Sequence, residues 1–267
     1  MNMERRLKKL NGLQPVYINV DNTPNLEPKP IREVIKEPDP EIKAEVFIMA
    51  DAQPQPSHRA IGVDIGTGFI SCAEAEESTV KFRKIRDAFF KLNPSKFLEG
   101  SANQFGENML KTSGAHYVKV DDILYVLGDS AFKFANLFHQ ECLRPMSKGV
   151  LNPKEPVSNL MVGELVKAIA GPPQNDNDIL YYCVPAPPLD ADFDVEYHRQ
   201  ILGGVFKELG YKNINVMTEG LAIVYSELAD TQYSGIGMSF GAGMCNIVYA
   251  FMGIPVFSFS LSRGGDW

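Results

Sequence analysis

Two glycine turns carry the residues of this chain that are best suited to bind phosphate. The stretch IGVDIGTGFIS at 61–71 matches IGMSFGAGMCN at 236–246 without a gap, and their glycines coincide. Glycine lets the backbone approach a ligand closely, and several N–H groups of such a turn can converge on one anion. Asp64 could hold Mg²⁺ through its waters, and Thr67 adds a hydroxyl. One such turn is usually an ordinary hairpin, but two matched turns predict facing hairpins that clamp a polyphosphate.

Strands and helices alternate around these turns. Residues 60–75 predict a strand, the glycine turn and a second strand, and residues 80–85 can form a third. The apolar run ILYYCV at 179–184, halted by Pro185, is typical of a buried central strand. The remaining expected elements are helices at 157–170, 192–209 and 219–229 and strands at 214–217, 236–240, 244–250 and 256–262. The pattern after residue 150 predicts an α/β architecture.

The segment between the possible strand at 80–85 and the strand at 179–184 begins without a clear periodic pattern. Residues 89–119 are polar and irregular, so they predict no regular element. A short strand at 123–127 follows, and then a helix that begins at Ser130.

Bulk composition excludes several classes of protein. The 267 residues carry a net charge of -7, which leaves no basic footprint for direct nucleic-acid binding. No apolar run approaches the roughly 18 residues of a membrane-spanning helix, and the N-terminus lacks the apolar centre of a secretory signal. The cysteines stand singly in apolar segments, unlike a zinc site or a disulfide framework. We therefore expect reduced thiols in a cytoplasmic protein.

The first 58 residues differ from the rest. They hold eight of the 18 prolines together with mixed charges, a composition that buries too little apolar surface to offset chain entropy. We expect a disordered Pro-rich arm at 1–58. Its opening MERRLKKLNGL could form a basic amphipathic helix that contacts a membrane or an adaptor, but the composition favours a solvated tail with a little transient helix.

The motif VDIGTG followed far downstream by a second glycine hairpin resembles the actin, sugar-kinase and heat-shock chaperone ATPase superfamily. MreB-type bacterial actins are the most similar members. LRPMSKGVLNP at 143–153, YYCVPAPP at 181–188, the helix, strand and helix at 194–228, and SRGGDW at 262–267 resemble family segments in the same order. The resemblance covers about residues 60–267 and is weakest at 89–140.

The resemblance implies an α/β, ribonuclease H-like actin-type ATPase fold. The first domain would span residues 59–232, with a small subdomain inserted at about 89–148, and a second domain would start at 233–267. Family chains continue well past Gly-Gly-Asp, so we expect the sequence to be the N-terminal part of a longer chain.

The resemblance also implies ATP and Mg²⁺ as cofactors and assigns residues to them. Asp64 takes the magnesium-facing position, and Glu196 matches the glutamate that orients the attacking water. A place in the first turn of a helix suits Glu196, because the helix dipole gathers anions and water there. Such a glutamate is also commonplace. The implied nucleotide contacts are Asp64, Gly66, Thr67, Gly68, Phe69, Glu219, Ser239, Gly241, Ala242, Gly243, Gly264 and Gly265.

Some of these assignments leave alternatives open. Glu219 can face the nucleotide or cap the following helix, and Gly264 and Gly265 can lie near the nucleotide or form a plain turn. The family usually carries an aspartate and a threonine where this chain has Ser239 and Ala242. Losing that carboxylate removes a magnesium and water contact, which puts hydrolysis in more doubt than binding.

The function implied is an ATP-dependent cytoskeletal filament former that self-associates and hydrolyses ATP slowly, serving cell shape or DNA positioning. A non-polymerising ATPase of the chaperone or sugar-kinase type is one alternative. A degenerate nucleotide-binding scaffold is another, in which Ser239 and Ala242 mark a lost activity.

Overall fold

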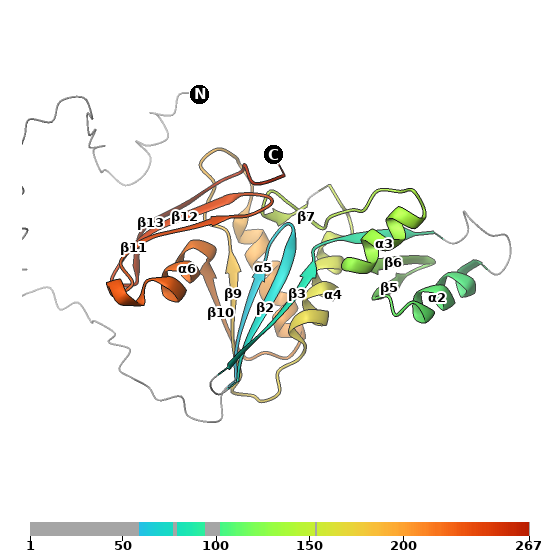
Figure 1. The fold of residues 1–267 in the computed structure, drawn as a ribbon, viewed down its shortest axis with the longest axis horizontal. Coiled ribbons are helices and arrows are strands. Elements are labelled where there is room, and N and C mark those ends of the chain that lie inside the picture. The colour runs from blue at the N-terminus through green and yellow to red at the C-terminus, as the bar shows by residue number, and fades with distance from the viewer. Residues whose placement is uncertain (1–58, 77–78, 94–101, 153, 267) are drawn as a thin grey trace, which may run out of the picture. The chain divides into compact units, whose positions relative to one another are not determined.

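The computed structural model describes residues 59–76, 79–93, 102–152 and 154–266, whose arrangement Figure 1 shows. The expected arm at 1–58, with its amphipathic opening, lies outside these residues. Within the described part of the chain, no helix is long and apolar enough to cross a membrane.

A five-stranded mixed sheet and the helices packed on it, here called the first domain, hold the largest hydrophobic core of the described residues. The strands of this sheet, in spatial order, are β10 (Asn213–Thr218), β9 (Ile179–Val184), β1 (Ala60–Ile65), β2 (Phe69–Glu76) and β3 (Thr79–Arg86). The first three run parallel, whereas β1, β2 and β3 form an antiparallel meander. The predictions of a strand–turn–strand unit at 60–75 and of a buried strand at 179–184 are confirmed.

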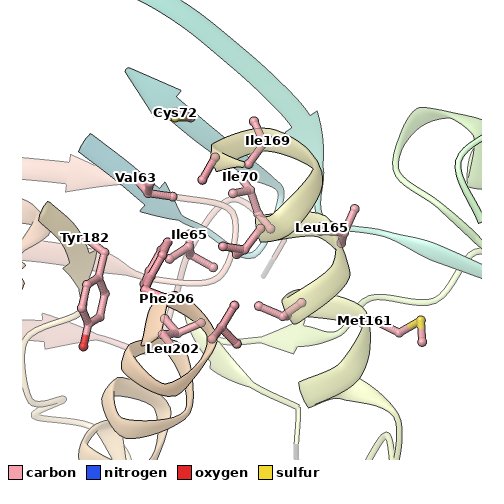
Figure 2. Close-up of a cluster of buried hydrophobic side chains, with 14 of the residues drawn as sticks. Val63, Ile65, Ile70, Cys72, Met161, Leu165, Ile169, Tyr182, Leu202 and Phe206 are labelled. Atoms are coloured by element: carbon pink, nitrogen blue, oxygen red, sulfur yellow. The ribbon is translucent and has the colours of Figure 1, made fainter. Parts of the chain in front are cut away.

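Two helices, α4 (Ser158–Ala170) and α5 (Val195–Glu208), cover one face of this sheet. Figure 2 shows the resulting core, in which strand residues such as Val63 and Ile70 meet Leu165 of α4 and Phe206 of α5. Successive strand side chains point to opposite faces. The alternation that buries Val63 therefore turns Asp64 to the face away from α4 and α5.

A small subdomain is inserted between β3 and α4. Its elements are the sheet β4-β6-β5, made of β4 (Phe89–Leu92), β6 (Ile123–Leu127) and β5 (Tyr117–Val120), with α2 (Ala102–Thr112), α3 (Asp129–Leu137) and the returning strands β7 (Met146–Ser147) and β8 (Val150–Leu151). It has its own core, in which Phe90 and Val126 meet Phe134 of α3.

The prediction that residues 89–119 form no regular element is wrong, because this segment contributes β4, α2 and β5. Both strands are only four residues long and pair with β6, which follows them in the sequence. Strands this short are stabilised by their partners rather than by local propensity, so no local pattern announces them.

The last part of the described chain is a second sheet packed on a helix. The sheet consists of β11 (Gly235–Phe240), β12 (Cys245–Phe251) and β13 (Ile254–Leu261), and it follows α6 (Glu219–Glu227) and a 3₁₀ turn at Ala229–Thr231. Val224 of α6 packs against Val248 and Ala250 of β12. The sheet is fixed to the first domain where the hydroxyl of Ser260 donates to the carbonyl of Ala186.

Candidate functional site

The two glycine hairpins line one cavity of about 450 Å³. The structure thus brings together two segments that lie 175 residues apart in the sequence. The walls come from the first hairpin (Asp64, Gly66, Thr67, Gly68, Phe69, Ser71), from the second hairpin (Ser239, Phe240, Gly241, Ala242, Gly243, Met244), and from Lys84, Arg86, Asp87, Phe132, Arg144, Gly149, Glu219 and Asp266.

The hairpins repeat each other in structure as well as in sequence. The amide of Gly66 donates to the carbonyl of Phe69 at 3.0 Å, and at the matched positions the amide of Gly241 donates to Met244 at 2.9 Å. Each turn is therefore closed by the same hydrogen bond. Exposed backbone N–H groups of such turns bind anions, so the pair is suited to hold phosphates between them.

A third segment closes the cavity from the side of the small subdomain. The hydroxyl of Thr67 accepts a hydrogen bond from the amide of Gly149 at 2.9 Å. A Cβ atom at Gly243 would collide with both of these atoms. Glycine is therefore required at position 243 for the two hairpins and the returning segment to meet.

Four acidic residues line the cavity, and the charge of one of them, Asp64 of β1, acts on another, Glu219 of α6. Glu219 is the first residue of α6, and its Oε2 accepts hydrogen bonds from the hydroxyl of Ser239 and the amide nitrogen of Asn246, each at 2.9 Å. Burial, together with the charge of Asp64, raises the pKa of Glu219 to about 7. Burial also raises the pKa of Asp64, and the ammonium of Lys84 opposes that shift. Ser239, which stands where the resembling family usually carries an aspartate, thus donates a hydrogen bond to the Glu219 carboxylate.

The chemistry of this wall agrees with a hydrated magnesium ion rather than with a protein-only metal cage. Among the described residues, no cluster of three or more acidic, histidine or cysteine side chains could hold a metal. Mg²⁺ keeps several waters and binds through one or two carboxylates plus substrate phosphates. Asp64, which opens onto the cavity, is the carboxylate best placed for that role.

The structure does not bring Glu196 to this cavity. Its carboxylate is exposed near the start of α5, where the Arg199 guanidinium and the Gln200 amide bind it and lower its pKa to about 2. The physical reason is the alternation of the sheet, because α5 covers the face opposite to Asp64. No residue of α5 lines the cavity between the hairpins.

Gly264 and Gly265 brace the second hairpin from outside the cavity. The amide of Gly265 donates to Gly241, and the amide of Asp266 donates to Ala242, each at 2.9 Å. Only Asp266 of this turn reaches the cavity, where it forms an ion pair with Arg144.

Sequence reasoning missed the charged residues that β3 and its continuation contribute. Lys84 and Arg86 line the cavity, and Asp87 beside them is buried. Burial raises the pKa of Asp87, although the charge of Arg144 and the backbone of Met146 oppose that shift. Strand periodicity could have predicted that Lys84 and Arg86 lie on the same face, since even-numbered residues of 80–86 point to one side of the strand.

Comparisons with known proteins agree with this architecture. A chain of the MamK double helical filament aligns at 20% identity with a TM-score of 0.53, over 79% of this chain and 56% of that one. MreB5 of Spiroplasma citri bound to ADP aligns at 14% identity and a TM-score of 0.46, over 79% and 54%. The filament of AlfA from B. subtilis plasmid pLS32 aligns at 14% identity with a TM-score of 0.46, over 78% of this chain and 73% of that one. The chain therefore spans just over half the length of the MamK and MreB5 chains.

No curated protein sequence matches the chain. A model of the family described as Volactin matches residues 59–267, which include both hairpins and every described element. This match shows the family, and the likeness to MamK, a bacterial actin-like protein, shows the fold. The chain has an actin-type fold and belongs to the Volactin family.

Proposed function

We propose that this chain is the nucleotide-binding part of an actin-like cytoskeletal protein that binds ATP with Mg²⁺ and assembles with itself into filaments. The observation that carries the proposal is the pair of matched hairpins around one cavity, with Asp64 and Glu219 at its wall. MamK, which shares the fold, was solved as a double helical filament.

Different residues of the cavity are assigned to the phosphates, to the magnesium ion and to the attacking water. Backbone N–H groups of the two hairpins hold the phosphates, and Asp64 holds Mg²⁺ through its waters. When bound, Mg²⁺ neutralises charge on the phosphates. We assign the water-orienting role to Glu219 in place of Glu196. A carboxylate whose pKa is about 7 can accept a proton near neutral pH, and Ser239 and Asn246 fix its orientation.

Hydrolysis is expected to be slow. The second hairpin offers only the neutral Ser239 and Ala242, whose positions supply no second carboxylate for water or magnesium. The degenerate-scaffold alternative differs in one measurable respect, because a scaffold would bind ATP without releasing phosphate.

The decisive experiment combines light scattering and phosphate release in the full-length protein with Mg-ATP. We expect scattering to rise above a threshold protein concentration and phosphate to follow slowly. Glu219→Gln should lower the rate of phosphate release by about 100-fold while ATP affinity changes little. Glu196→Gln is the matched control and should leave the rate close to that of the wild type.

Other results would redirect the proposal. Scattering that never responds to ATP, with turnover linear in protein, would favour a non-polymerising ATPase. Equal rates for Glu219→Gln and the wild type would remove Glu219 from the reaction.

A further inference from the structure

Three side chains form one row across the face of the sheet that opens to the cavity. In the strand pairing, Asp64 of β1 lies opposite Ser71 of β2, and Ser71 lies opposite Lys84 of β3. Directly paired residues of neighbouring strands point to the same face, and all three residues line the cavity. The row therefore extends the phosphate hairpin by one strand and ends in an ammonium group.

Lys84 differs from the other two cations of the cavity wall. Arg86 pairs with Asp129 at 3.0 Å, and Arg144 pairs with Asp266. Within the described residues, Lys84 makes no ion pair. Its ammonium lies 3.9 Å from the centroid of the Phe69 ring, and its charge acts on Asp64. It is the cation of this wall that can bind a new anion without breaking an existing pair.

The contact with Phe69 explains how the lysine is held before a ligand arrives. The attraction of an ammonium to an aromatic face is weak at an exposed site, so it favours one orientation of the side chain without preventing its transfer to a phosphate. Phe69 belongs to the first hairpin, so the ring keeps the ammonium beside the turn that is expected to bind phosphate.

The second hairpin makes such a cation more important. Its Ser239 hydroxyl already donates to Glu219, and Ala242 has no polar group. The side chains that can meet phosphate charge therefore come from the first domain. The cavity also holds the carboxylates Asp64 and Glu219, which repel a polyphosphate unless a cation offsets them.

We propose that Lys84 is the side-chain cation that binds the phosphate chain of the nucleotide in this cavity. The inference rests on the proposed function and adds to it a binding residue on β3, outside both glycine hairpins. Lysine binds phosphate as a mobile point charge, which agrees with its exposed place at the end of the row.

Titration calorimetry with Mg-ATP and with inorganic tripolyphosphate tests the proposal in the full-length protein. Lys84→Gln should weaken binding of both ligands at least tenfold, and Lys84→Arg should restore most of the affinity. Lys81→Gln removes the same charge from the same strand on the other face, away from the cavity, and should change affinity less than twofold. Circular dichroism of each variant checks that the fold is kept.

The outcomes separate the two proposals. Wild-type protein that binds neither ligand would overturn both of them. Wild-type protein that binds ATP, with Lys84→Gln binding equally well, would overturn only the role of Lys84. Equal losses in Lys84→Gln and Lys81→Gln would show an effect of net charge and would also overturn it.

Discussion

Two titratable residues, the half-buried Glu219 and the buried His198, are expected to act on stability in opposite directions. His198 is fully buried, its Nδ1 accepts the amide of Leu151 at 3.3 Å, and burial lowers its pKa to about 4. As pH falls from about 6.5 towards 4, the unfolded chain gains a proton at His198 that the folded protein refuses, so stability is lost. As pH falls from about 7 towards 4.5, folded Glu219 gains a proton before the unfolded chain does, so stability rises.

Single substitutions should separate these two contributions. Each shift corresponds to about 3 kcal/mol. Relative to the wild type, Glu219→Gln should become less stable by about that amount as pH falls from 7.5 to 4.5. His198→Gln should become relatively more stable as pH falls through its window. Urea unfolding of the three proteins at several pH values measures this, and parallel curves would contradict both pKa assignments.

At the scale of elements, the contact between α6 and β11 depends on Gly237. A Cβ atom at Gly237 of β11 would collide with the carbonyl of Gly220 in α6. Gly237→Ala should therefore force the helix and the sheet apart and destabilise the protein by about 2 kcal/mol or more. Gly204 is the matched control, because it lies within α5 with nothing near its Cβ position.

Gly204→Ala should stabilise the protein by roughly 0.5–1 kcal/mol, since alanine favours the helix over the unfolded chain. Thermal unfolding of both variants gives the comparison. A neutral Gly237→Ala would mean that α6 and β11 can separate freely.

Elements with a local signal were predictable from the sequence. A local sequence pattern of about a dozen residues predicts each of three units: α4 by its apolar period, β9 by its uninterrupted apolar run, and the hairpin at 60–75 by its glycine turn. The strands β4 and β5 do not, because their conformation depends on pairing with β6. Family resemblance predicted nucleotide contacts on both hairpins, which line one cavity, and a role for Glu196, which does not line it. Only the three-dimensional pairing shows that α5 covers the opposite face and that Lys84 continues the row from Asp64.

At the scale of the whole molecule, a buried charge network ties the start of β1 to distant segments. Arg59 pairs with Glu74 of β2 and with Asp178 before β9, and it donates to the carbonyl of Pro172. Arg83 of β3 also pairs with Glu74, at 3.0 Å. Although burial opposes it, the two guanidinium groups hold the pKa of Glu74 below its usual value. The carboxylate is thus the common partner of two cations.

Glu74→Gln should remove the carboxylate that Arg59 and Arg83 share, leave Arg59 with Asp178 as its acidic partner, and cost about 3 kcal/mol of unfolding free energy. Glu107→Gln is the control. Glu107 also joins two cations, Lys111 and Lys119, but on the surface of the small subdomain. That variant should lose less than about 1 kcal/mol. Chemical denaturation distinguishes the two, and equal losses would mean that the buried network adds nothing specific.

The junction of Thr67, Gly149 and Gly243 has a mechanical consequence. Protein packed this tightly transmits displacement rather than absorbing it. Gly149 belongs to the segment that returns from the small subdomain, while Thr67 and Gly243 belong to the two hairpins. The three segments are therefore in direct contact at one point. Any displacement of either hairpin is therefore passed to Gly149, and through it to the segment that returns from the small subdomain.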